Sequence, residues 1–155
     1  MNEHTKNAKN HLEANDCCLV YCNENEICTS HVRGVLSLVL MVKEKRTMED
    51  FYCADKVVGK AAAFMYAILK PRELYAFVLS EKAKEILDQY GIKYYYGEKV
   101  PAIINRKGDG FCPMETATEN AATPSEALSL LEKKLNLEGE VPKGKTAEVQ
   151  IVKEA

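Results

Sequence analysis

A strand, a helix and a second strand follow one another in LYAFVLSEKAKEILDQYGIKYYY (residues 74–96). Residues 74–79 form an unbroken apolar run of strand length, and Ser80 is typical of a helix N-cap. Gly91 suits the position just after a helix end, and residues 92–96 are rich in residues that favour strands. Strands that are apolar throughout and alternate with helices are buried on both faces, so the segment predicts an α/β fold.

The flanking sequence adds elements on both sides of this unit. Residues 17–22 and 26–30 have the composition of two strands joined by turn residues, which predicts a β-hairpin. Apolar residues at helical spacing predict helices over about 34–45 and 55–69, and Pro113 opens a short helix. Thr123, Pro124 and Glu126 have capping-box spacing before the last helix. Together these elements predict an α/β sandwich with helices on both faces of the sheet.

Length and composition set the expected organisation of the chain. The 155 residues suffice for one domain, which we place at 16–122, with a polar arm outside the core at 1–15. A C-terminal helix at 123–137 and a Lys, Glu and Gly rich mobile tail at 138–155 complete the prediction. A net charge of -2 favours neither a nucleic acid polymer nor an anionic membrane as partner. No apolar run is long enough to span a bilayer.

The cysteines and the N-terminal residues favour a cytoplasmic location. The six cysteines show no Cys-x-x-Cys pair, and no histidine motif accompanies them to form a zinc set. Four of them fall in the predicted hairpin, where reduced cysteine behaves as a small apolar residue. Because no secretory leader opens the chain, we expect reduced core thiols in the cytoplasm.

The first candidate site segment is residues 54–63, ADKVVGKAAA. If a helix begins at Asp55, Lys56 and Lys60 lie one turn apart near its positive end, where cations are unfavourable unless an anion binds. Gly59 between them indicates a close approach to the backbone. The segment predicts a site for an anionic or nucleotide-like ligand. The alternative is that both lysines are solvated and Gly59 only permits packing.

The second candidate segment is residues 103–115, IINRKGDGFCPME. Asn105 and the turn glycines Gly108 and Gly110 form a loop that is expected to line the same ligand site. Cys112 precedes a predicted helix start, where a thiol can be activated as a nucleophile, although a plain N-cap or core role is favoured. Glu115 at the third helical position is expected to satisfy a capping amide or to hold a ribose hydroxyl.

Residues 54–63, 103–106 and 112–115 resemble a bacterial family known only as a domain of unknown function with a cytidine-deaminase-like fold. The resemblance spans about 16–121 and implies a three-layer α/β/α sandwich around a mixed sheet. Active deaminases of that fold bind zinc through a His- or Cys-Ala-Glu triplet and a Pro-Cys-x-x-Cys motif at two helix starts. The corresponding positions here look like 54–56 and 80–83, which read ADK and SEKA. The resemblance therefore implies a pocket that binds a nucleotide-like ligand without zinc.

Three functions follow from these observations. The leading hypothesis is a metal-free binding domain, without cofactor, that holds a small anionic or nucleotide-like ligand through Asp55, Lys56, Lys60, Asn105 and the loop at 108–115. The second is an enzyme with Cys112 as nucleophile or Lys56 as base or Schiff-base former. The third is a structural protein that forms a homo-oligomer through the apolar helix at 35–42.

Overall fold

A computed structural model describes residues 1–32, 34–105, 107–137 and 149–152. Its centre is a six-stranded mixed sheet with the strand order β5-β4-β3-β1-β2-β6. β3, β4 and β5 are parallel, whereas β1 is antiparallel to both β2 and β3, and β2 is antiparallel to β6. The strands are β1 Leu19–Cys22, β2 Ile27–Ser30, β3 Tyr52–Val58, β4 Glu73–Ser80, β5 Tyr94–Val100 and β6 Val149–Val152.

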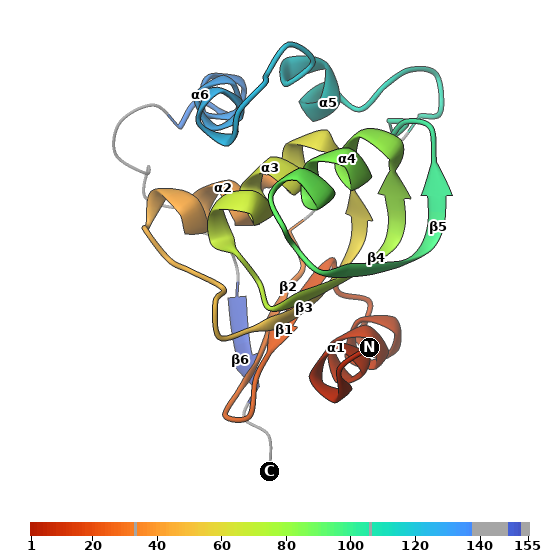
Figure 1. Cartoon of the computed structure of the whole chain (residues 1–155), viewed down its shortest axis with the longest axis vertical. Coiled ribbons are helices and arrows are strands. Elements are labelled where there is room, and N and C mark those ends of the chain that lie inside the picture. The colour runs from red at the N-terminus through yellow and green to blue at the C-terminus, as the bar shows by residue number, and fades with distance from the viewer. Residues whose placement is uncertain (33, 106, 138–148, 153–155) are drawn as a thin grey trace.

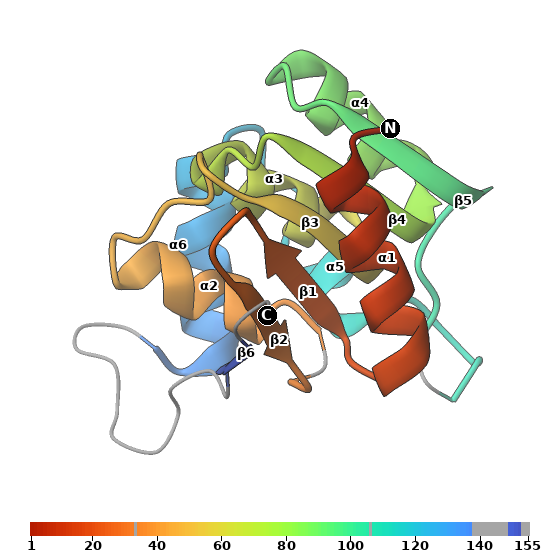
Figure 2. The same ribbon diagram turned by 90° about the horizontal axis from the view of Figure 1, so that it is seen from below.

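Helices cover both faces of the sheet (Figure 1). The first helix, α1, lies on one face across β1 and β3, as Figure 2 shows from below. Helices α2, α3 and α4 cover the other face, and α5 and α6 pack on the outer side of α3. This arrangement confirms the predicted three-layer α/β sandwich. The helices are α1 Glu3–Asn15, α2 Leu36–Lys43, α3 Lys60–Leu69, α4 Glu81–Gln89, α5 Pro113–Ala117 and α6 Pro124–Leu135.

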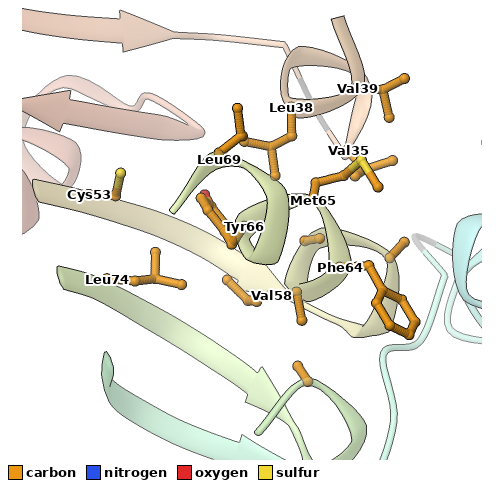
Figure 3. Packing of buried hydrophobic residues seen from close by; sticks show 14 of the residues in the cluster. Val35, Leu38, Val39, Cys53, Val58, Phe64, Met65, Tyr66, Leu69 and Leu74 are labelled. Carbon is orange, nitrogen blue, oxygen red and sulfur yellow. The ribbon is translucent and has the colours of Figure 1, made fainter. Parts of the chain in front are cut away.

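The main hydrophobic core lies between the sheet and α3 (Figure 3). α3 is buried almost all round, with Phe64, Met65, Tyr66 and Leu69 packed among residues of α2 and the strands. A helix that is apolar on every side has to be covered by other elements, which explains why α2, α4 and α6 surround it. α3 is therefore the central buried helix.

Several local predictions are confirmed. The hairpin is β1 and β2, and the Ser80 hydroxyl caps α4 by accepting from the Ala83 amide at 3.1 Å. Gly91 follows α4 with φ +70°, a left-handed conformation that glycine adopts without strain. The Thr123 hydroxyl caps α6 by accepting from the Glu126 amide at 3.2 Å.

The predicted helix over 55–69 is wrong in its first part. Residues 52–58 form β3, which pairs with β4 in parallel, and α3 begins only at Lys60. Two β-branched residues, Val57 and Val58, favour a strand, and the pairing partner across the sheet settles the competition. Gly59 has an extended backbone and is the N-cap of α3. Asp55 and Lys56 consequently belong to a strand, not to a helix start.

The prediction that residues 1–15 lie outside the core is also wrong. These residues form α1, in which the Asn2 side chain caps the helix by accepting from the His4 amide at 2.8 Å. Thr5, Ala8 and Leu12 are buried, and the two apolar residues form a second core cluster with residues of the opposite sheet face. Their spacing of three and four residues matches one helical face, which a composition-based reading overlooks.

Three further predictions need correction, stay predictions or lie outside the described residues. Most apolar residues of α2 are buried against the core, and homo-oligomer formation through residues 35–42 stays a prediction. β5 begins at Tyr94, two residues later than predicted. Within the predicted mobile tail, residues 149–152 form β6 and pair with β2, whereas 138–148 and 153–155 are not described. In the described part of the chain, no helix is long and apolar enough to cross a membrane.

Candidate functional site

A cavity of about 800 Å³ opens at the edge of the sheet where β3 ends and β1 begins. Ligands of open α/β sheets bind in the crevice outside the carboxyl ends of the strands, which is where this cavity lies. Its wall is mainly apolar, with contributions from the start of α2, the end of β3 and the loop at 103–115. The polar lining residues are Cys18, Ser37, Asp55, Lys56, Asn105, Lys107, Asp109, Cys112 and Glu115.

A smaller pocket of about 270 Å³ lies between the starts of α3 and α4. Lys60 lines it from α3, and Ser80 and Lys82 line it from the start of α4. Ile103 and Glu115 line both this pocket and the larger cavity. The two spaces therefore share a wall, which the 103–115 loop supplies.

The carboxylate of Glu115 occupies the N-terminus of α3. Its Oε1 accepts from the Lys60 amide at 2.7 Å, and its Oε2 accepts from the Ala61 amide at 3.1 Å. Burial raises the pKa of Glu115, although the amides of Ala61 and Lys60 act to lower it. The helix N-terminus does attract an anion, as the sequence predicts, but the anion is the protein's own side chain. The expectation that Glu115 satisfies a capping amide is confirmed, and the capped amides belong to α3.

Gly59 is the residue that makes this contact possible. A Cβ at position 59 would overlap the Glu115 carboxylate and come within 2.9 Å of Ile103 Cγ1. The prediction that something approaches the backbone closely at Gly59 is thus explained by Glu115 and Ile103. Gly59 also lines the large cavity, and its role in binding a ligand stays a prediction.

The side chain of Asp55 points toward α3 and bonds to Tyr66 there. Its Oδ2 accepts from the hydroxyl of Tyr66 at 2.6 Å, and its Oδ1 accepts from the Val57 amide at 3.3 Å. Burial raises the pKa of Asp55 to about 7, although hydrogen bonds from Tyr66 and from the backbone of Val57 and Lys56 act to lower it. A titratable carboxyl with a strongly raised pKa on a cavity wall is a functional-site candidate.

The two lysines of the first segment lie apart. Lys56 Nζ lies 3.1 Å from Asp16 Oδ1, while Lys60 Nζ donates to the Glu119 carbonyl at 2.8 Å and lies over the Phe64 ring. Because Lys56 is in β3 and Lys60 is in α3, the predicted pair on one helix face is wrong. Lys56 lines the large cavity, and Lys60 lines the small pocket.

The loop at 103–112 is held by its own hydrogen bonds. Asn105 Nδ2 donates to Asp109 Oδ1 at 2.9 Å, and the Asn105 amide donates to the Gly110 carbonyl at 2.8 Å. Gly108 has φ +75°, so a glycine is needed for this turn. The amide group of Asn105 therefore shapes the loop, which in turn forms the cavity wall.

Cys112 is the N-cap residue of α5 and lines the large cavity with a partly exposed side chain. Its amide donates to the Ile103 carbonyl at 3.0 Å, which ties the start of α5 to the loop. Cys18 is the other partly exposed cysteine and lines the same cavity. The predicted N-cap position is confirmed, and the nucleophile role stays a prediction.

Two residues of the site escape sequence reasoning. Tyr66 sits among apolar residues of the predicted central helix, and only its hydroxyl hints at a polar partner. Asp109 is visible as turn chemistry, but its bond with Asn105 depends on the loop conformation. Neither role is visible in the sequence, because a hydrogen bond to another element or within an irregular loop leaves no periodic pattern.

Two helix starts correspond to the zinc-binding motifs of deaminases, and the position of the first needs correction. The first is at Gly59, Lys60 and Ala61, not at 54–56, while the second is at Ser80 as expected. Neither start supplies a His or Cys side chain. Within residues 1–32, 34–105, 107–137 and 149–152, no three His, Cys, Asp or Glu side chains are grouped to hold a metal ion.

The fold and the site define an α/β sandwich protein with a mainly apolar cavity at the carboxyl edge of its parallel strands. The chain belongs to the family described as Domain of unknown function (DUF1893), whose model matches residues 7–135. The match includes most of α1 and all of α6, so the family extends beyond the 16–121 span of the sequence resemblance.

A solved structure supports this assignment. The chain is similar to the crystal structure of a DUF1893 family protein from Thermotoga maritima, with 28% sequence identity and a TM-score of 0.80. The similarity covers 86% of this chain and 91% of the other. None of the curated proteins matches the chain.

Proposed function

We propose that the protein is a metal-free binding domain for a small nucleoside-like or nucleotide-like ligand. The observation that carries this proposal is the cavity of about 800 Å³ at the carboxyl edge of β3, with Asp55 on its wall. Its size and mainly apolar lining with few polar groups match small-molecule sites in general. The cytidine-deaminase-like relationship is part of the same proposal, since such folds bind nucleoside-type molecules.

The geometry changes the expected chemistry of the ligand. A strongly anionic group cannot bind at the start of α3, because the Glu115 carboxylate already accepts from the amides of Lys60 and Ala61. An apolar ring system suits the cavity better. If the ligand carries a phosphate, Lys107 is an exposed basic side chain on the described part of the loop that would meet it.

Cavity blocking tests the proposal. Val57 lines the cavity and is 43% exposed, so Val57→Trp should fill space there without disturbing the core. Tyr96 is 42% exposed on β5 and is absent from the cavity lining, so Tyr96→Trp is a matched control. Thermal unfolding would be followed with and without nucleosides, nucleotides and sugar phosphates.

A ligand at 100 times its dissociation constant adds about 2.7 kcal/mol to the free energy of unfolding, a shift of several degrees. We expect at least one nucleoside or nucleotide to shift wild type and Tyr96→Trp, but not Val57→Trp. A panel without any effect on wild type, or an equal shift in all three proteins, would argue against the proposal.

A catalytic role for Cys112 is the second candidate, because its partly exposed thiol lines the same cavity. Lys56 is less suited to such a role, since it is paired with Asp16 and lies away from Lys60. Iodoacetamide labelling at neutral pH tests Cys112 against Cys18, the matched partly exposed thiol. Faster modification of Cys112, slowed by a bound nucleoside, supports nucleophile chemistry, whereas equal rates count against it.

The remaining proposals concern location and assembly. We propose a cytoplasmic protein, since six cysteines are free in the structure and four of them are buried. Light scattering measures whether the chain forms a homo-oligomer. An assembly through residues 35–42 stays a prediction, although most apolar residues of α2 are buried.

A further inference from the structure

Asp55 and Tyr66 form a hydrogen-bonded pair at the boundary between the core and the cavity. Tyr66 is fully buried on α3, and its hydroxyl donates to Asp55 Oδ2 at 2.6 Å. Burial raises the pKa of Tyr66 well above its ordinary value, so its hydroxyl keeps its proton. The pair therefore holds the Asp55 carboxyl in one orientation.

Asp55 retains capacity to accept further hydrogen bonds. An ionised carboxylate offers about four lone-pair positions. Tyr66 uses one on Oδ2, and the Val57 amide uses one on Oδ1 at a long 3.3 Å. The Lys56 amide lies near the carboxylate, but it donates to the Cys18 carbonyl at 3.2 Å. Each oxygen can thus accept from a second donor that enters from the cavity.

Several other polar side chains of the cavity wall bond within the protein. Lys56 is paired with Asp16, Asn105 is bonded to Asp109, and Glu115 accepts from the start of α3. The hydroxyl of Ser37 is bonded to that of Ser30 at 2.8 Å. Lys107 and Cys112 also line the wall, but a lysine ammonium cannot accept a hydrogen bond and a thiol accepts only weakly, so Asp55 is the acceptor that we consider for a ligand.

We infer that Asp55 recognises a ligand that presents two adjacent N–H donors, such as the ring N–H and amino group of a guanine-type heterocycle or an amidine. The inference rests on the proposed function, because it names the ligand class of the same cavity. Two parallel N–H donors match the two oxygens of a carboxylate, which gives geometric selectivity as well as affinity. An analogue without one donor leaves a carboxylate oxygen unsatisfied in a mainly apolar site.

The ionisation state of Asp55 gives the inference a pH signature. The titratable neighbours of the Asp55 carboxyl are Tyr66 on α3 and Cys53 on β3. Burial raises the pKa of the Cys53 thiol, and the backbone of Lys56 supplies a further donor near the carboxyl. Glu115, Asp109 and Lys107 line the same cavity from the loop and α5. Guanosine stays neutral between pH 6 and 8, whereas Asp55 ionises in this range because burial places its pKa at about 7. The affinity for guanosine should therefore rise between pH 6 and 8.

Guanosine and inosine provide the test, because inosine lacks only the amino group. Isothermal titration of wild type should give a dissociation constant at least about tenfold lower for guanosine than for inosine at pH 8. In Asp55→Asn this preference should disappear. Asp88→Asn is the matched control, since Asp88 also accepts from a tyrosine hydroxyl, that of Tyr94 at 2.7 Å, but lies outside the cavity lining.

Other results would overturn the inference and separate it from the proposed function. Equal affinities of wild type for the two nucleosides, a preference that persists in Asp55→Asn, or affinity independent of pH would refute the role of Asp55 while leaving a nucleoside site in place. Benzamidine serves as the amidine probe, and the inference fails if neither nucleoside nor benzamidine binds. If no compound of the thermal-shift panel stabilises the wild type, the proposed function fails too. The pH series on wild type decides the matter even if Asp55→Asn does not fold.

Discussion

At the scale of single residues, the site is organised by one carboxylate and one glycine. Glu115 reaches from α5 to the first amides of α3, where it neutralises the positive helix end. Gly59 leaves room for that carboxylate, because any Cβ would overlap it. The contact joins the loop that lines the cavity to the central helix, so it positions the cavity wall.

Gly59→Ala should therefore destabilise the fold. Overlap of the new Cβ with Glu115 and with Ile103 has to be relieved by displacement, at a cost of about 1 to 3 kcal/mol in the free energy of unfolding. Urea unfolding measures it. Gly110→Ala is the matched control, because a Cβ there lies 3.5 Å from Asn105 Nδ2 and should change stability by less than about 0.5 kcal/mol. Equal effects of the two variants would contradict this account.

Asp55 should make stability depend on pH. Burial raises the pKa of the folded carboxyl from 3.8 to about 7, so between these values the folded protein binds the proton more tightly than the unfolded chain. The contribution of Asp55 to stability is thus present at pH 4 and is lost as pH rises through 7. Relative to wild type, Asp55→Asn should gain on the order of 2 kcal/mol between pH 4 and 8, after allowing for the partial exposure of the carboxyl.

Chemical unfolding at several pH values measures this difference. A stability difference between the two proteins that stays constant from pH 4 to 8 would show that Asp55 has an ordinary pKa. Asp88→Asn serves as the control here also, because the pKa of Asp88 is lowered by Lys84 and Tyr94 and should not produce a loss of stability toward pH 7.

At the scale of whole elements, α1 is the helix whose role is least visible in the sequence. It has a single large apolar residue, Leu12, yet that side chain is 3% exposed and packs with Ala8 against the sheet. Without α1, the β1 and β3 side chains Val20 and Ala54 would face water. The helix therefore completes the second outer layer of the sandwich.

Leu12→Ala should cost about 2 to 5 kcal/mol, as expected for a large buried side chain replaced by a small one. Glu13→Ala, at an exposed position of the same helix, should change the free energy of unfolding by less than about 0.5 kcal/mol. Thermal or urea denaturation compares them. A Leu12→Ala protein as stable as Glu13→Ala would restore the view of residues 1–15 as an arm outside the core.

At the scale of the whole molecule, the fold sorts chemically identical thiols into two groups. Cys18 and Cys112 are partly exposed, whereas Cys17, Cys22, Cys28 and Cys53 are buried. Burial raises the pKa of Cys28 to about 11 and also raises the pKa of Cys53 well above its ordinary value, which suppresses the reactive thiolate. Reactivity toward alkylating reagents should therefore report on the folded state as a whole.

Native mass spectrometry after brief iodoacetamide treatment should show modification at Cys18 and Cys112 only. After unfolding in urea, all six cysteines should react. Rapid native labelling of Cys28 or Cys53 would mean that the core opens or that the sheet is arranged differently. The unfolded sample is the control for intrinsic reactivity.

The fold could be predicted to a large extent because local patterns determine most of its elements. The hairpin, the caps at Ser80 and Thr123 and the turn at Gly91 depend on residues within a few positions of one another. The boundary between β3 and α3 could not, because residues 55–58 fit either state by local preference. Pairing with β4 decides in favour of the strand.

The candidate site shows the same division. The sequence by itself determined which segments are candidates, 54–63 and 103–115, because both combine glycines with polar residues, and residues of both segments line the cavity. Only the tertiary structure decided that Glu115 fills the helix N-terminus, that Lys56 and Lys60 separate, and that Asp55 meets Tyr66. The physical reason is that short-range preferences act within a few residues, whereas these contacts form between segments brought together by packing of the core.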